Sequence, residues 1–162
     1  MNPPFRIIFV CTGNYCRSPM AEVLFKKRIT EAGLADEIEV LSAGTCALEG
    51  FPASRGAYYV ANRFGLSLEA FVSQPLTREL CESANLIIVM EQAHLDWIQV
   101  SFPEAVCKTV LLGELIDPDR PQDVPDPISA GEHYFIYIAK LLNGAFDKLI
   151  EDWTSIRKRY QA

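Results

Sequence analysis

A cysteine and an arginine lie six positions apart, Cys11 and Arg17, within the stretch FVCTGNYCRSPMAE. A cysteine thiolate is a strong nucleophile, and an arginine guanidinium can bind two oxygens of a phosphate at once. The turn between them contains Gly13, which permits a positive φ and a close approach to a ligand, and Asn14, which tolerates the left-handed region. This combination predicts a site in which a thiol attacks a tetrahedral phosphate that the arginine binds.

The residues on either side of this turn indicate how the chain positions it. The run Phe5–Val10 is short and apolar, as in a buried strand, and Ser18 with Pro19 indicates a helix start, with serine at the N-cap and proline at the first helical position. Because a helix N-terminus and the N–H groups of the turn before it attract anions, we expect Cys11–Arg17 to form an anion-binding loop. Its positive field favours the thiolate of Cys11, and Ser18 can donate a hydrogen bond to the sulfur.

Strand-like and helix-like patterns alternate along the rest of the chain. Further strands are expected at 38–41, 86–90 and 110–112, and helices at 53–64, 77–83 and, as one long element, 134–156. The pattern predicts one domain over residues 1–162, a three-layer α/β fold of the flavodoxin-like type with a four-stranded parallel sheet and helices on both faces. In such sheets, ligands bind at the carboxyl ends of the strands, where the Cys11–Arg17 loop would lie.

Composition narrows the classes of function and partner. A net charge of −6 argues against nucleic acid as a partner, and the apolar runs are too short for a membrane span. The first residues lack the pattern of a signal peptide, and five cysteines without a Cys-x-x-Cys pair fit free thiols, so a cytoplasmic protein is expected. With only two, distant histidines, no metal site is expected.

The stretch VCTGNYCRSPMAE resembles the signature V-C-x-G-N-x-C-R-S-P-x-A-E of the low-molecular-weight protein tyrosine phosphatase family. Further motifs that match this family follow in order along the chain: SAGT, SQPLT, LIIVME and DVPDP. The resemblance implies the fold of the phosphotyrosine phosphatase I type and a hydrolase that needs no metal and no cofactor. It also implies that the substrate is a phosphotyrosine-containing protein or a small phosphomonoester, and a cognate tyrosine kinase is a candidate partner.

The resemblance also implies roles for particular residues. Cys11 would attack phosphorus to give a cysteinyl-phosphate, which water then hydrolyses, and Asp126, between two prolines, would act first as general acid and then as base. Arg17 and the loop amides would bind the phosphate oxygens, the loop residues being Thr12, Gly13, Asn14, Tyr15, Cys16 and Arg17. Two alternatives stay open for the acid: Asp117 and Asp123 share its proline-rich segment, and Asp126 could instead only cap the last helix.

Supporting residues follow from the same resemblance. Asn14, Ser18 and Ser42 would brace the loop through a polar network. A histidine that many relatives have in this network is replaced here by Phe71, so the network must be rebuilt, with Ser42 as one candidate, or be partly absent. Cys16 would act as a redox partner by forming a reversible disulfide with Cys11 after oxidation.

The pocket walls depart from the family pattern. Where phosphotyrosine-specific relatives commonly have aromatic residues, this chain has Leu48 and Ile128, so Tyr15 is either the stacking surface for the substrate or a rim residue without that role. Neither Glu91 nor His94 is predicted to be catalytic; Glu91 could brace the loop, and His94 is expected on a helix surface. The remaining cysteines are expected to be buried packing residues, namely Cys46, Cys81 and Cys107.

Three other functions compete with tyrosine dephosphorylation. Phosphoarginine phosphatases have a small threonine where this chain has Tyr15. Arsenate reductases on this scaffold need a further cysteine pair, and only Cys81 lies in a suitable region, with no partner before Cys107. A non-catalytic phosphoprotein-binding module would need Arg17 but neither Cys11 nor an acid.

Overall fold

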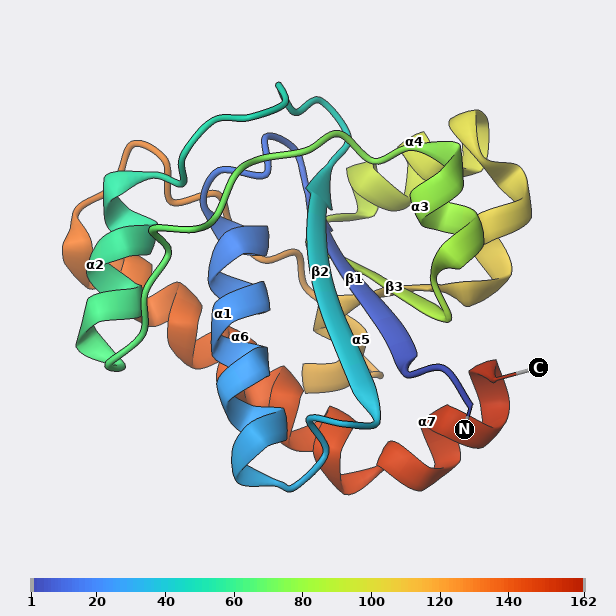
Figure 1. The fold of residues 1–162 in the computed structure, drawn as a ribbon. Helices are drawn as coiled ribbons and strands as arrows, with labels where there is room; N and C mark the ends of the chain where they lie inside the picture. Colours follow the sequence, from blue (N-terminus) through green and yellow to red (C-terminus); the bar gives the residue numbers. More distant parts are fainter. Residues whose placement is uncertain (1, 162) are drawn as a thin grey trace.

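A computed structural model describes residues 2–161 and has a four-stranded parallel sheet in the order β2-β1-β3-β4 (Figure 1). The strands are β1 (Phe5–Cys11), β2 (Ile38–Gly44), β3 (Leu86–Val89) and β4 (Thr109–Leu111). They are short and rich in β-branched residues, as expected where helices cover both faces of a sheet. The predicted fold class is therefore confirmed.

The helices form the two outer layers. They are α1 (Arg17–Glu31), α2 (Arg55–Arg63), α3 (Arg78–Ser83), α4 (Gln92–Ser101), α5 (Leu112–Ile116), α6 (Glu132–Glu151), α7 (Trp153–Tyr160) and the 3₁₀ helix η1 (Pro103–Lys108). One apolar cluster joins the sheet to α1, α2 and α6, and a second joins it to α3, α4 and η1. Figure 1 shows α1, α2 and α6 together on one side and α3 and α4 on the other.

The alternation of side chains along β1 determines which layer each residue faces. Phe9 and Cys11 belong to the cluster with α1 and α6, whereas Ile8 and Val10 belong to the cluster with α4. In the parallel register Cys11 lies opposite Gly44, the last residue of β2. The carboxyl ends of the strands therefore place the segment after Cys11 at one edge of the sheet.

Two predicted boundaries are wrong. Helix α1 begins at Arg17 with Cys16 as its N-cap, so Ser18 and Pro19 each lie two residues further inside the helix than predicted. The predicted helix 134–156 is two helices, because the backbone of Asp152 leaves the helical region between α6 and α7. The apolar face is still used beyond this break: Trp153 packs edge-on against Phe5 of β1, with ring centroids 5.0 Å apart.

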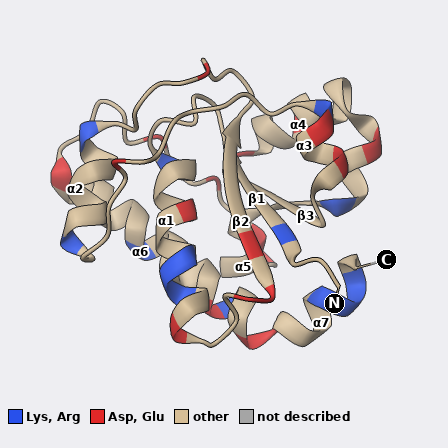
Figure 2. Ribbon diagram, in the orientation of Figure 1, with Lys and Arg blue, Asp and Glu red and all other residues tan. Residues whose placement is uncertain are grey.

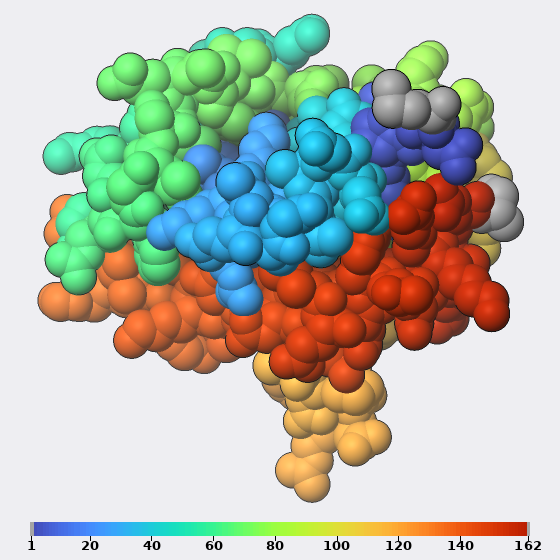
Figure 3. Space-filling view, turned by 60° about the horizontal axis from the view of Figure 1, so that its bottom comes forward, coloured from blue at the N-terminus to red at the C-terminus, as the bar shows by residue number. Residues whose placement is uncertain are grey.

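Residues 2–161 contain no candidate membrane span, and charges of both signs are mixed in the view of Figure 2. Within residues 2–161 there is no helix with the length and hydropathy needed to cross a bilayer. Lys and Arg are spread over several helices and are interspersed with Asp and Glu (Figure 2). In the space-filling view, the segment at the end of α5 and the start of the following loop projects beyond the face formed by α6 and α7 (Figure 3).

Candidate active site

The loop after β1 turns sharply at Asn14, the residue with a positive φ, 51°. Of the two loop residues expected to tolerate this conformation, Asn14 adopts it as predicted, whereas the φ of Gly13 is not in the left-handed region. Asn14 can adopt the left-handed region because its short polar side chain forms local hydrogen bonds there. The loop is thus shaped by an asparagine that is fully buried.

A glycine outside the loop allows it to lie against β2. A Cβ on Gly44 would be 2.5 Å from the carbonyl oxygen of Thr12 and 2.8 Å from the backbone nitrogen of Asn14. These neighbours are backbone atoms that cannot move aside as a flexible side chain can. In the sequence, the glycine of SAGT is the only local sign of this contact.

The predicted polar network around Asn14 is present and has been rebuilt without the histidine. Asn14 Nδ2 donates to Ser18 Oγ (2.8 Å) and to Ser42 Oγ (3.0 Å), and Asn14 Oδ1 accepts from the backbone N–H of Gln74 (2.9 Å). The Gln74 side chain also donates to the carbonyl of Ser42 (3.0 Å). Phe71 instead packs against the apolar core, so Gln74 is the supporting residue that the sequence analysis missed.

The nucleophile candidate lies beside a hydroxyl group. Cys11 Sγ is 2.9 Å from Ser18 Oγ. Ser18 Oγ accepts a hydrogen bond from Asn14, and its one proton can be donated to the Cys11 sulfur or to the carbonyl oxygen of Ala43, which is farther away at 3.4 Å. The network therefore supplies a donor to a Cys11 thiolate, and hydrogen bonds to the charged form stabilise it.

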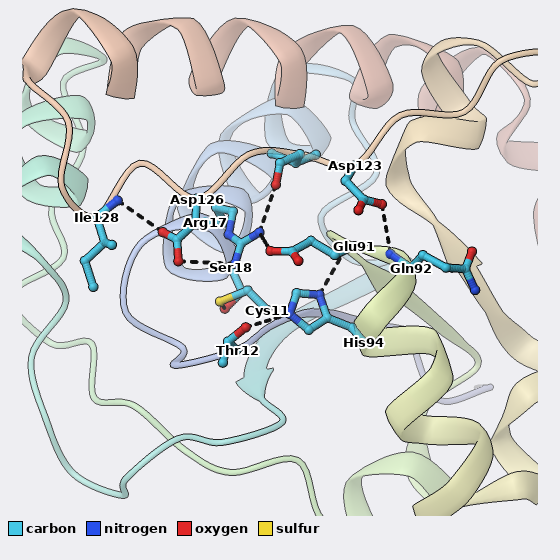
Figure 4. Close-up of polar contacts among 11 residues, drawn as sticks. Cys11, Thr12, Arg17, Ser18, Glu91, Gln92, His94, Asp123, Asp126 and Ile128 are labelled. Atoms are coloured by element: carbon cyan, nitrogen blue, oxygen red, sulfur yellow. Dashed lines mark hydrogen bonds and ion pairs between the residues drawn. The ribbon is translucent and has the colours of Figure 1, made fainter.

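Arg17 connects the loop to two other segments. Its side chain is only 2% exposed; Nη1 donates to a carboxylate oxygen of Glu91 and to the carbonyl oxygen of Val124 (2.8 Å). Nη2 lies 3.6 Å from Asp126 Oδ2. The guanidinium is thus held in place by partners on β3–α4 and on the proline-rich segment, as drawn in Figure 4.

The segment Asp117–Pro127, termed here the acid loop, crosses above the anion-binding loop (Figure 4). The carboxylate of Asp126 points toward Arg17, and it also accepts from the backbone N–H of Ile128 (3.1 Å). Asp123 instead accepts from the N–H of Gln92 at the start of α4 (2.9 Å), and Asp117 accepts from two N–H groups of its own turn. Of the three candidate acids, Asp126 is the one that reaches the site.

The idea that Asp126 only caps the last helix is also wrong. Helix α6 begins at Glu132, and its N-cap is Gly131, five residues beyond Asp126.

A pocket of about 160 Å³ opens between the two loops. Its lining residues come from the anion-binding loop and from the end of the acid loop: Cys11, Thr12, Gly13, Tyr15, Cys16, Arg17, Asp126 and Ile128. Ile128 is 60% exposed and Tyr15 is 41% exposed, so both stand at the rim. Leu48 is exposed and does not line this pocket.

His94 is buried rather than on a helix surface, so this expectation is wrong. It is 3% exposed and lies at the start of α4, with Nε2 2.8 Å from Thr12 Oγ1. Its Nδ1 accepts from the backbone N–H of Glu91, while the Glu91 side chain accepts from the backbone at His94, forming a capping box. Glu at the N-cap with His at N3 is a short-range signal of this geometry, but no sequence pattern links His94 to Thr12.

The other cysteines divide into buried and exposed thiols, and all are free. Cys81 is buried as predicted, but Cys46 and Cys107 are exposed, because they lie in the turn after β2 and in η1. Burial raises the pKa of Cys81 to about 11, so it would be a poor thiolate for the resolving step of an arsenate reductase. Burial likewise raises the pKa of Cys16 to about 11.

Among residues 2–161, no group of three or more His, Cys, Asp or Glu side chains is arranged to hold a metal ion. The groups that line the pocket include the Cys11 thiol, the Arg17 guanidinium and the Asp126 carboxylate.

Comparison with known proteins places this arrangement in a family. The family described as low molecular weight phosphotyrosine protein phosphatase matches residues 6–162. A probable low molecular weight protein-tyrosine-phosphatase, AmsI of Erwinia amylovora, is 36% identical over 89% of this chain and 94% of its own length. A protein-arginine-phosphatase of Geobacillus stearothermophilus is 35% identical over 91% of this chain and 95% of its own length.

A solved structure gives the same result at the level of the fold. The arginine phosphatase YwlE, in a variant with a phosphorylated active-site serine, superimposes with a TM-score of 0.88 at 34% identity and covers 96% of this chain and 99% of its own. The chain described here belongs to the low molecular weight phosphotyrosine protein phosphatase family.

Proposed function

We propose that this protein is a cysteine-dependent phosphatase that removes phosphate from protein phosphotyrosine. The observation that carries the proposal is the convergence on one small pocket of Cys11, Arg17 and Asp126, which come from two segments more than a hundred positions apart. A binding module would need the guanidinium alone. The thiol with its Ser18 donor and the facing carboxylate are the additional groups that turnover requires.

In the first step, the Cys11 sulfur attacks phosphorus, the phosphorus–oxygen bond to the tyrosine ring breaks, and Asp126 donates its proton to the leaving oxygen. The loop amides from Thr12 to Arg17 and the Arg17 guanidinium bind the three equatorial oxygens, which carry the developing charge. In the second step, Asp126 accepts a proton from water as the water attacks phosphorus, and the Cys11 thiolate leaves. Ser18 stabilises that thiolate at the start and at the end of the cycle.

A second candidate substrate is phosphoarginine, and a specific observation favours it. Two of the relatives described above are arginine phosphatases, at 35% and 34% identity, close to the 36% of the tyrosine phosphatase. The chain differs from the pattern of that branch at Tyr15, whose ring stands at the rim and reduces the space for a guanidinium while offering a stacking surface to a phenyl ring. We therefore favour phosphotyrosine.

The test compares kcat/KM on peptides of one sequence that contain phosphotyrosine, phosphoarginine or phosphoserine. We expect phosphotyrosine to be the best substrate, and Tyr15→Thr to shift the ratio toward phosphoarginine. Cys11→Ser is expected to lower turnover by at least about 10⁴-fold while it still binds inorganic phosphate. A Cys11→Ser enzyme with normal turnover would refute the mechanism, and a wild-type preference for phosphoarginine would change the substrate.

Four further features belong to this proposal. Residues 1–162 form one domain, and the protein acts in the cytoplasm. Its partners are phosphotyrosine proteins and the tyrosine kinase that phosphorylates them. Cys16, buried in the same loop as Cys11, protects the nucleophile by forming a reversible disulfide with it.

A further inference from the structure

His94 is a buried histidine whose two ring nitrogens both have partners. Nδ1 faces the backbone N–H of Glu91 at 3.0 Å, and Nε2 faces the hydroxyl oxygen of Thr12 at 2.8 Å. These partners lie on different segments, since Thr12 is in the anion-binding loop and Glu91 caps α4. His94 therefore bridges the pocket loop and the start of α4, as the dashed lines in Figure 4 show.

The Glu91 contact determines where the ring carries its proton. A backbone N–H can only donate, so Nδ1 must be the acceptor and the neutral ring must carry its hydrogen on Nε2. Nε2 then donates to Thr12 Oγ1. A doubly protonated ring would place Nδ1–H against the Glu91 N–H and would break the capping box.

The surroundings of the ring also favour the neutral form. Burial, and then the nearby Arg17 guanidinium, lower the pKa of His94 below its usual value of 6.5, whereas the carboxylates of Glu91, Asp123 and Asp126 act in the opposite direction. At neutral pH the ring is therefore uncharged and remains a donor to Thr12.

The neutral His94 ring determines how the Thr12 hydroxyl can form hydrogen bonds. A hydroxyl that accepts from His94 still has one proton of its own to donate. Thr12 lines the pocket beside Cys11 and Arg17, so this proton can be directed at an anion bound there. The His94 ring excludes the alternative in which the hydroxyl donates its proton toward α4.

We propose that His94 is a positioning residue, which holds the Thr12 hydroxyl as a hydrogen-bond donor to the phosphoryl oxygens in the pocket. The inference rests on the proposed phosphatase function and adds one side-chain donor to the backbone amides of the loop. If His94 had only a structural role, that role would be to complete the capping box of α4, and it would not involve Thr12. The two roles predict different results when Thr12 and His94 are changed together.

The experiment is a double-mutant cycle on the full chain with Thr12→Val, His94→Leu and the double variant. Each single change is expected to lower kcat/KM about tenfold and to weaken the binding of inorganic phosphate by a similar factor. The double variant is expected to lose about tenfold as well, rather than about a hundredfold, because both changes remove the same donor. His133→Leu, on the exposed first turn of α6, is the matched control and should leave both values unchanged.

Two results would overturn the proposal. One is a Thr12→Val enzyme with wild-type kcat/KM and wild-type phosphate affinity. The other is a double variant whose loss equals the product of the single losses, which would mean that His94 acts through general structure. His94→Gln separates a folding defect from the proposed role, since Gln at this position can accept from Glu91 and donate to Thr12, and is expected to restore most of the activity.

A measurement independent of turnover keeps the test separate from the proposed function. Nitrogen NMR of the ring, in the free protein and with inorganic phosphate bound, should show a protonated Nε2 and an unprotonated Nδ1 at neutral pH. A protonated Nδ1 would refute the inference even in an active enzyme. If the protein hydrolysed no phosphomonoester, the proposed function would fail, while the ring tautomer and the phosphate-binding cycle would still decide the role of His94.

Discussion

The two loops that form the pocket are held in very different ways. In the anion-binding loop, Cys11, Asn14 and Arg17 are buried, and the backbone is anchored by hydrogen bonds to Thr45, Cys46 and Ser54. The acid loop is exposed over most of its length, and the Asp126 side chain is 44% exposed. The groups that bind and attack the phosphate are therefore more strongly fixed than the group that transfers the proton.

The acid loop is nevertheless attached to β3, α4 and Arg17 through residues close to the Asp126 carboxylate. Val124, which is buried, donates its N–H to the carbonyl of Met90 (2.8 Å) and accepts from Arg17 through its own carbonyl (2.8 Å). Asp123 adds a bond to Gln92. Arg17 therefore has two roles, since the guanidinium that is predicted to bind phosphate also fixes the loop that bears Asp126.

The largest expected effect of a side-chain change at this junction comes from Arg17→Lys. An ammonium group cannot bond Glu91, Val124 and two phosphate oxygens at the same time, so both loops lose their common partner. We expect kcat/KM to fall by about 10³-fold on a phosphotyrosine peptide. Arg63→Lys, at the exposed end of α2, is the control, and a loss below about tenfold for Arg17→Lys would show that the guanidinium geometry is not required.

Changing the proton donor alone should have a smaller effect, because the anion-binding loop stays intact. Asp126→Asn is expected to lower kcat by about 10²-fold while phosphate affinity changes little. The loss should be greater on phenyl phosphate than on para-nitrophenyl phosphate, whose leaving group depends less on protonation. Asp119→Asn, in the exposed part of the same loop, is the control; equal losses for the two variants would remove Asp126 from the mechanism.

Oxidation should have the smallest lasting effect. Because Cys11 and Cys16 lie in one fixed loop, peroxide is expected to convert Cys11 to a sulfenic acid, which condenses with the Cys16 thiol to give a disulfide and water. Activity should return after treatment with dithiothreitol, and peptide mapping should find the Cys11–Cys16 bond. Recovery of Cys11 only as sulfinic acid would contradict this.

Similarity to relatives does not identify the substrate of this protein, because the relatives include both tyrosine and arginine phosphatases. The scaffold is shared by tyrosine and arginine phosphatases at similar identity, so the fold does not decide between them. We expect the choice to depend on residues at the rim of the pocket, such as Tyr15 and Ile128.

The sequence by itself determined the parts of this protein that depend on near neighbours. Hydrophobic runs and turn residues predicted the four strands, α1, α2, α3 and one helix where α6 and α7 lie, but gave no range for α4, α5 or η1. The residues of the Cys11–Arg17 stretch predicted the anion-binding loop. The resemblance to the phosphatase family, through the motif DVPDP, favoured Asp126 over Asp117 and Asp123. These signals are local, because strand and helix periods and short loops are set by residues a few positions apart.

Tertiary structure decided the contacts between distant segments. Thr12 and His94 are 82 positions apart, Asn14 and Gln74 are 60 apart, and Arg17 and Val124 are 107 apart. Each contact depends on the strand order and register, which bring the carboxyl ends of β1, β2 and β3 to one edge of the sheet. Local periodicity does not specify that arrangement, so the residues that position the predicted chemistry became visible only in the folded chain.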